Sequence, residues 1–113
     1  MANERYYKMT ARLTQLTQLL DKNPNDAFLL FAVAKEYEKM GDPVEALRFY
    51  QRLQATQPDY VGLYYHLGKL HERGMDIPQA IQAYQNGVLV AQKAGDRHAL
   101  SELKGALMEL GEE

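Results

Sequence analysis

Few residues of the chain could support catalysis or metal binding. His66 and His71 are five residues apart, so on a helix their side chains diverge by about 140° and cannot share a metal ion. Ser101 has no histidine and acid at a spacing typical of nucleophilic catalysis. The glycines form no phosphate-binding loop, and the absence of cysteine excludes disulfides and thiolate metal sites. We therefore expect no enzymatic activity, no metal and no cofactor.

A second set of residues is suited to binding, because aromatic rings and cations recur together on one helical face. The set comprises Phe28, Phe31, Lys35 and Lys39, followed by Tyr65, His66, Lys69 and Arg73. Two phenylalanines on a face that should contact water indicate that something covers them. The cover is either a bound partner segment, with Tyr65 beside it, or the chain's own N-terminal helix or another copy of the chain.

The cations of this set permit two interpretations. Lys35 with Lys69, and Lys39 with Arg73, would form a short basic row suited to a carboxylate or an acidic peptide. Lys35 and Lys69 also stand three residues before a glutamate, and residues at that spacing pair along their own helix. The second interpretation predicts ordinary ion pairs in contact with solvent.

The elements that position these residues follow from an internal repeat of 34 residues. Residues of the same type recur at this spacing from the first part of the chain to the second. The identical pairs include Pro24 and Pro58, Leu29 and Leu63, Lys35 and Lys69, Glu38 and Glu72, Asp42 and Asp76, Ala46 and Ala80, Tyr50 and Tyr84, and Gln51 and Gln85. A fixed period in this range predicts stacked helical repeats.

Each repeat has the pattern of two helices. Asp42 and Asp76 are expected to cap the second helix of their repeats. Gly41 is expected to end the first helix in the left-handed conformation, and Gly74 to do the same one position earlier in its repeat. His71 should be half-buried. The predicted helices span about 4–22, 26–40, 43–56, 60–73, 78–94 and 97–110.

This pattern resembles the tetratricopeptide repeat (TPR). That family places a large, an aliphatic, a small and an aromatic residue on the first helix, then a small, an aromatic and a small residue and a proline. The first repeat has Leu30, Val33, Ala34, Tyr37, Ala46, Tyr50, Leu53 and Pro58, and the second has Tyr64, Leu67, Gly68, His71, Ala80, Tyr84, Gly87 and Gln92. The resemblance implies an all-α, right-handed solenoid of helical hairpins with two full repeats, at 27–60 and 61–94.

The flanking segments extend this resemblance to a single TPR domain over residues 1–113. The helix at 4–22 looks like a half-repeat without its first helix, and the helix at 97–110 resembles the family's capping helix. His98 should be exposed in the first turn of that capping helix. The missing partner helix would leave Tyr6, Tyr7, Met9 and Leu13 partly uncovered, which invites a second copy.

The resemblance implies an adaptor that binds a peptide or protein segment in a concave groove lined by the first helix of each repeat. The alternative is a self-association module that forms homodimers. One family subgroup grips carboxylates with a lysine–asparagine clamp, but this chain has Phe31, Lys35, His66, Asp96 and Leu100 at the matching positions, so we do not expect that activity.

Composition limits the remaining classes of partner. The formal net charge is −2 and the cations are scattered, which argues against nucleic acid. The longest apolar run, residues 27–34, is too short to cross a membrane. The first residues show no signal segment, so we expect a cytoplasmic protein.

Overall fold

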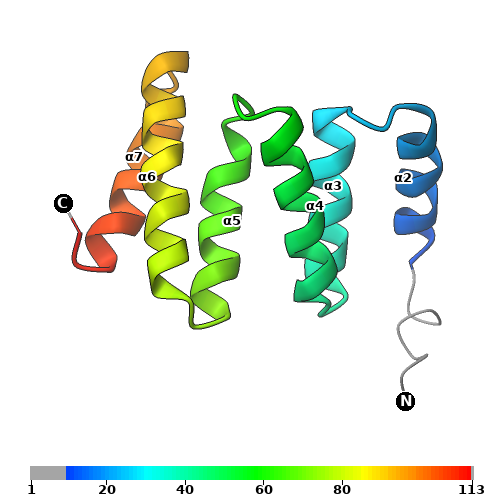
Figure 1. The fold of residues 1–113 in the computed structure, drawn as a ribbon, viewed down its shortest axis with the longest axis horizontal. Coiled ribbons are helices and arrows are strands. Elements are labelled where there is room, and N and C mark those ends of the chain that lie inside the picture. The colour runs from blue at the N-terminus through cyan, green and yellow to red at the C-terminus, as the bar shows by residue number, and fades with distance from the viewer. Residues whose placement is uncertain (1–9, 113) are drawn as a thin grey trace. The chain divides into compact units, whose positions relative to one another are not determined.

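The computed structural model describes residues 10–112, which form six α-helices and no strand (Figure 1). The helices are α2 (Ala11–Lys22), α3 (Ala27–Lys39), α4 (Pro43–Thr56), α5 (Gly62–Arg73), α6 (Ile77–Ala94) and α7 (Arg97–Glu109). They divide into two compact units, Met1–Gln57 and Pro58–Glu113. The predicted all-α fold of helical hairpins is therefore confirmed.

Within the described residues, no helix combines the length and the apolar character that a membrane span requires.

Side-chain caps explain where most of these helices begin. Five helices follow a residue whose side-chain oxygen accepts a hydrogen bond from the backbone N–H three residues later, which satisfies a donor that the helix itself cannot. The capping residues are Thr10, Asp26, Asp42, Asp76 and Asp96. The caps predicted at Asp42 and Asp76 are therefore present.

The first described helix is shorter than the predicted helix at 4–22. Thr10 has an extended backbone, with φ −75° and ψ 158°, and its hydroxyl accepts from the Leu13 N–H at 2.9 Å. This cap starts a helix at Ala11, so a helix running through residue 10 is excluded. Residues 4–9, with Tyr6, Tyr7 and Met9 of the predicted open face, lie outside the described residues.

The prediction that Leu13 remains partly uncovered is wrong. Leu13 has no exposed surface, and Leu16 and Leu20 on the same face of α2 are also buried. This face packs against α3, which therefore covers the stripe that the sequence left without a partner. Leu13 is therefore not available to a second copy of the chain, and it cannot belong to the predicted dimer face.

The turns of the two repeats are alike, but different residue types take the left-handed position. Asp42 N donates to Tyr37 O, and Asp76 N donates to His71 O, each at 2.9 Å. This shared bond places the left-handed residue directly before the aspartate. That residue is Gly41 in the first repeat, with φ 76°, as predicted.

In the second repeat the left-handed residue is Met75, with φ 63°, whereas Gly74 has φ −82°. Gly74 is the C-cap of α5 and so ends that helix as predicted, but the prediction that it takes the left-handed conformation is wrong. The hydrogen bond that closes the turn determines which residue takes the left-handed conformation, and the position of the glycine does not.

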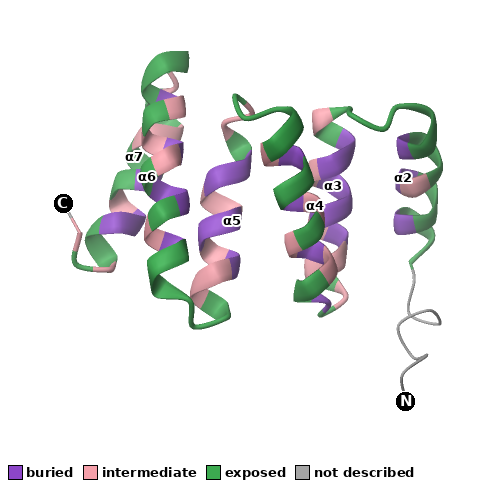
Figure 2. Ribbon diagram, viewed as in Figure 1, coloured by how far each residue is buried: buried purple, intermediate pink, exposed green. Residues whose placement is uncertain are grey.

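Two positions of the second unit have room only for glycine, because helices approach each other closely there. A Cβ atom added to Gly68 would stand 2.1 Å from Cε1 of Tyr84, and one added to Gly87 would stand 2.5 Å from Cβ of Tyr64. Tyr84 is completely buried, so its ring cannot move aside without disturbing the core. Figure 2 shows the buried positions facing inward along α5 and α6. Both glycines therefore stand where two helices approach each other closely.

Candidate protein-binding site

The aromatic residues of the first unit lie on α3 and differ in how far they are exposed. Phe28 is 61% exposed, which is unusual for a phenylalanine. Phe31, one helical turn later, is half-buried, and its ring centroid lies 6.1 Å from that of Tyr50 on α4. Phe28 is therefore available to a partner, whereas Phe31 also belongs to the packing of the α3–α4 hairpin.

A polar cluster beside Phe31 fixes the same face of α3. The hydroxyl of the buried Tyr50 donates to Oε2 of Glu38, and Lys35 Nζ lies 3.9 Å from the same oxygen. The predicted pairing of Lys35 along its own helix is thus present. The Glu38 side chain is only 11% exposed, so these partners compensate for most of its lost hydration.

The second unit repeats this cluster on α5 and α6. The Tyr84 hydroxyl donates to Oε2 of Glu72, and Lys69 Nζ lies 3.5 Å from that oxygen. The Tyr65 ring, at the position equivalent to Phe31, has its centroid 6.3 Å from that of Tyr84. Lys69 Nζ also lies 5.4 Å from the centroid of the Tyr65 ring, within reach of a cation–π interaction. His66 packs edge-on against Tyr65 at 5.7 Å.

Electrostatics keep Tyr84 in its donor form. Burial, together with the hydrogen bond to Glu72 and the charge of that carboxylate, raises the pKa of Tyr84 well above its ordinary value. A phenolate there would be buried beside the Glu72 carboxylate, and repulsion between the two negative charges disfavours it. The phenol therefore remains protonated at neutral pH and can donate to Glu72.

A buried carboxylate on α3 was not predicted from the sequence. Glu36 is 4% exposed, and its oxygens receive the Thr10 hydroxyl at 3.2 Å and Arg12 Nε at 3.1 Å. Lys39 Nζ lies 3.6 Å away on the same helix. Thr10 and Arg12 belong to the start of α2, so Glu36 ties that end of α2 to α3.

Ion pairs with glutamates neutralise most of the lysines of the predicted basic row. Lys35 and Lys69 each face a glutamate, and the exposed Lys39 faces Glu36. Arg73 is exposed at the end of α5. Ion pairs of this kind are weak, so a ligand acid can still compete for the lysines, but the aromatic side chains remain the stronger anchors.

The histidines lie where the sequence predicted. His71 is half-buried and His98 is exposed. Within residues 10–112, no group of three or more histidine, cysteine or acidic side chains could hold a metal ion.

Comparison with known proteins identifies the family. No protein-family model matches the chain. A TPR repeat-containing protein of Pseudomonas aeruginosa is 32% identical to it over 95 residues, which cover 84% of this chain and 90% of that protein. The chain belongs to the tetratricopeptide repeat family. TPR proteins are in general scaffolds for protein–protein interaction.

Solved structures of TPR proteins agree with this assignment. A TPR domain protein of Salinibacter ruber is 43% identical and has a TM-score of 0.71 in its crystal structure, which covers 74% of this chain and 93% of that one. The solution structure of that domain has a TM-score of 0.73. A protein of Bordetella parapertussis is 27% identical, with a TM-score of 0.78 and coverage of 91% and 90%.

The sequence carries a signal for the two tyrosine–glutamate bonds. Glu38 and Tyr50, and again Glu72 and Tyr84, are separated by twelve residues and recur at the repeat period. Identical polar and aromatic partners that recur as a pair indicate a contact between the two helices of each hairpin. Glu36 has no such signal, because the residue one repeat later, Leu70, is apolar and the carboxylate is therefore not repeated.

Proposed function

We propose that this TPR protein is an adaptor that binds a peptide or protein segment through the first helix of each repeat. The proposed binding residues are those of the aromatic and cationic set, namely Phe28, Phe31, Lys35, Lys39, Tyr65, His66, Lys69 and Arg73. The observation that carries the proposal is the exposure of Phe28, 61%, on a face of α3 that the Tyr50–Glu38–Lys35 cluster holds in place. A rigid face with an exposed ring is suited to an apolar anchor residue.

The chemistry of these faces favours a ligand that is mainly apolar, with an acidic group as a secondary feature. Phe28 can contact an aliphatic or aromatic side chain, and Tyr65 offers a ring that Lys69 already approaches. An acid on the ligand would have to draw Lys35 or Lys69 away from its glutamate. We therefore expect ring removal to weaken binding more than lysine removal does.

Selection of binders from a random peptide library, followed by calorimetry with the selected peptides, tests the proposal. Phe28→Ala should weaken binding by about 1–2 kcal/mol, because it removes an exposed anchor without opening a cavity. Val44→Ala is the matched control, since Val44 is an exposed apolar residue of α4 in the same unit. Equal affinities of wild type, Phe28→Ala and Tyr65→Ala for the selected peptides would contradict the proposal.

The same titrations show whether one ligand uses both faces. If a single peptide contacts α3 and α5, Phe28→Ala and Tyr65→Ala should each weaken that peptide. We propose that residues 1–113 act as one TPR domain in this binding. Separate peptide families, each sensitive to only one of the two variants, would instead assign independent sites to the two repeats.

A further inference from the structure

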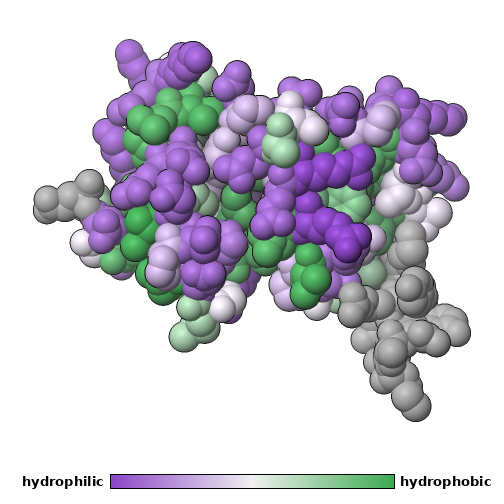
Figure 3. Space-filling model, viewed as in Figure 1, coloured by the Kyte–Doolittle hydropathy of each residue, from purple (hydrophilic) through white to green (hydrophobic). Residues whose placement is uncertain are grey.

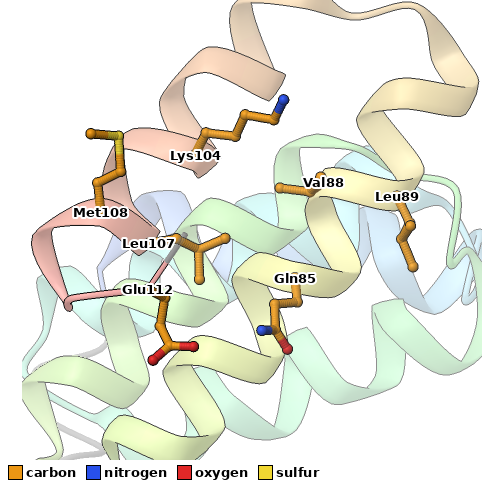
Figure 4. A pocket seen from close by; sticks show the side chains of 7 residues that line it. All are labelled: Gln85, Val88, Leu89, Lys104, Leu107, Met108 and Glu112. Atoms are coloured by element: carbon orange, nitrogen blue, oxygen red, sulfur yellow. The ribbon is translucent and has the colours of Figure 1, made fainter.

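A groove between α6 and α7 is not used by the proposed adaptor function. It lies entirely within the second unit and has a volume of about 580 Å³. Its apolar wall consists of Val88 and Leu89 from α6 and Leu107 and Met108 from α7 (Figure 4). Lys104 and Glu112 also line it.

The exposure of this apolar wall is unusual for a protein surface. Leu89 is 66% exposed and Met108 is 72% exposed, and both border the same hollow. Figure 3 shows apolar surface interrupting the polar covering over the part of the molecule that α6 and α7 form. Side chains of this size left together in water indicate an interaction surface.

The charged side chains beside the groove have opposite signs and lie on opposite sides of its apolar wall. Figure 4 shows Lys104 on one side of Val88 and Leu107, and Glu112 on the other. Neither makes an ion pair with another side chain among residues 10–112. Such an arrangement is self-complementary, because a two-fold rotation about the middle of the groove brings a cation onto an anion twice.

We propose that the occupant of this groove is a second copy of the chain, packed groove to groove about a two-fold axis. In this dimer the protruding Leu89 and Met108 of each copy fill the hollow of the other. Lys104 of one copy then pairs with Glu112 of the second copy, and the reverse pair forms at the other end. The interface uses no residue of α3 or α5, so it is independent of the proposed peptide binding.

Sedimentation equilibrium of the purified chain over a range of concentrations tests the proposal. The wild type should show a reversible monomer–dimer equilibrium. Leu89→Glu and Met108→Glu should each raise the dimer Kd by at least about tenfold, because each change is present twice in the interface. Val44→Glu is the matched control at an exposed apolar residue outside the groove, and it should leave Kd unchanged. Circular dichroism checks that each variant remains helical.

Charge exchange at low salt provides a sharper test that does not depend on the apolar variants. Lys104→Glu places two glutamates together at each end of the dimer, and Glu112→Lys places two lysines together. Each variant alone should have a Kd about 2- to 30-fold above that of wild type, as expected for two exposed ion pairs. A mixture of the two variants should form a heterodimer as tight as the wild-type dimer, since every pair then has opposite signs.

Two results would overturn the proposal. The first is a wild type that remains monomeric up to millimolar concentration, in which case the groove belongs to a different occupant, such as a helix of another protein. The second is a dimer whose Kd responds neither to Leu89→Glu and Met108→Glu nor to the mixing of the two charge variants.

Discussion

The hydroxyl of Tyr84 on α6 donates a hydrogen bond to the carboxylate of Glu72 on α5. One repeat earlier, Tyr50 makes the same bond to Glu38. In each hairpin a fully buried ring thus has its polar end at a carboxylate that a lysine also approaches. Both repeats therefore have the same polar contact between their two helices, and it lies beside the face that carries the aromatic residues.

Removing these phenol hydroxyls should destabilise the protein. Tyr50→Phe and Tyr84→Phe should each lower the free energy of unfolding by about 1–3 kcal/mol, because a carboxylate loses a charge-assisted bond. Tyr50→Phe should cost more, since the Glu38 side chain is 11% exposed and that of Glu72 is 24% exposed. Urea unfolding measures both. Tyr37→Phe is the control, because its hydroxyl bonds to no other side chain among the described residues, and an equal loss in all three variants would contradict the prediction.

Stability should decline in alkaline solution. Burial and the neighbouring Glu72 raise the pKa of Tyr84, and burial also raises the pKa of Tyr37 and of Tyr64 above the ordinary 10.0. Above about pH 10 the unfolded chain loses phenolic protons that the folded chain keeps. The unfolded state then binds fewer protons, so the free energy of unfolding falls as pH rises, and the contribution is complete below that range.

Urea midpoints between about pH 8 and pH 11 check this dependence. Tyr84→Phe should show a shallower alkaline decline than wild type, because it removes one of the shifted groups. Identical slopes in the two proteins would show that Tyr84 ionises equally well in the folded and unfolded chains.

A substitution in the turn between α5 and α6 should stabilise the protein. Met75 has φ 63°, a conformation in which a side chain is strained and glycine is not. Met75→Gly should raise the free energy of unfolding by about 1 kcal/mol, and Met75 is exposed enough that little packing is lost. Gly41→Ala should cost about as much at the equivalent position. Gly74→Ala is the control and should be tolerated, since its φ is −82° and its Cβ would make only ordinary contacts.

Two helical glycines should respond in opposite directions to the same substitution. Gly68→Ala forces a methyl group into the ring of Tyr84 and should cost about 1–3 kcal/mol. Gly105→Ala adds its methyl group to open space inside α7 and should stabilise by about 0.5–1 kcal/mol. Thermal unfolding of both variants checks the prediction. A loss of stability in Gly105→Ala would show that α7 is packed more tightly on that side than the structure shows.

The contacts of Glu36 should govern how firmly α2 stays in place. Arg12→Ala leaves a carboxylate that is 4% exposed with one partner fewer and should loosen α2 first. Hydrogen exchange should therefore accelerate in α2 and remain slow in α6. Arg48→Ala is the matched control, because the Arg48–Glu45 pair at 3.5 Å lies at the surface. Equal exchange of α2 in both variants would contradict this role.

The sequence by itself determined the helices and the family. The positions of Asp42 and Asp76, the stripe of Leu30, Val33 and Ala34, and the period of 34 residues depend on interactions within a few turns of helix, so they can be read locally. The same holds for Gly68, which stands at a position where the TPR pattern has a small residue. Identity and spacing were enough in these cases because each residue acts within its own repeat.

Only the tertiary structure decided the burial of Glu36 and Leu13, the left-handed position of Met75 and the groove between α6 and α7. Leu13 and Glu36 are buried because α2 meets α3 on that side, which periodicity within one helix does not specify. Met75 takes its conformation from the hydrogen bond between Asp76 and His71. The groove exists because α7 covers one side of α6 and leaves Leu89 uncovered. Each depends on which faces meet in three dimensions, and a pattern along one helix carries no record of the neighbour that it will contact.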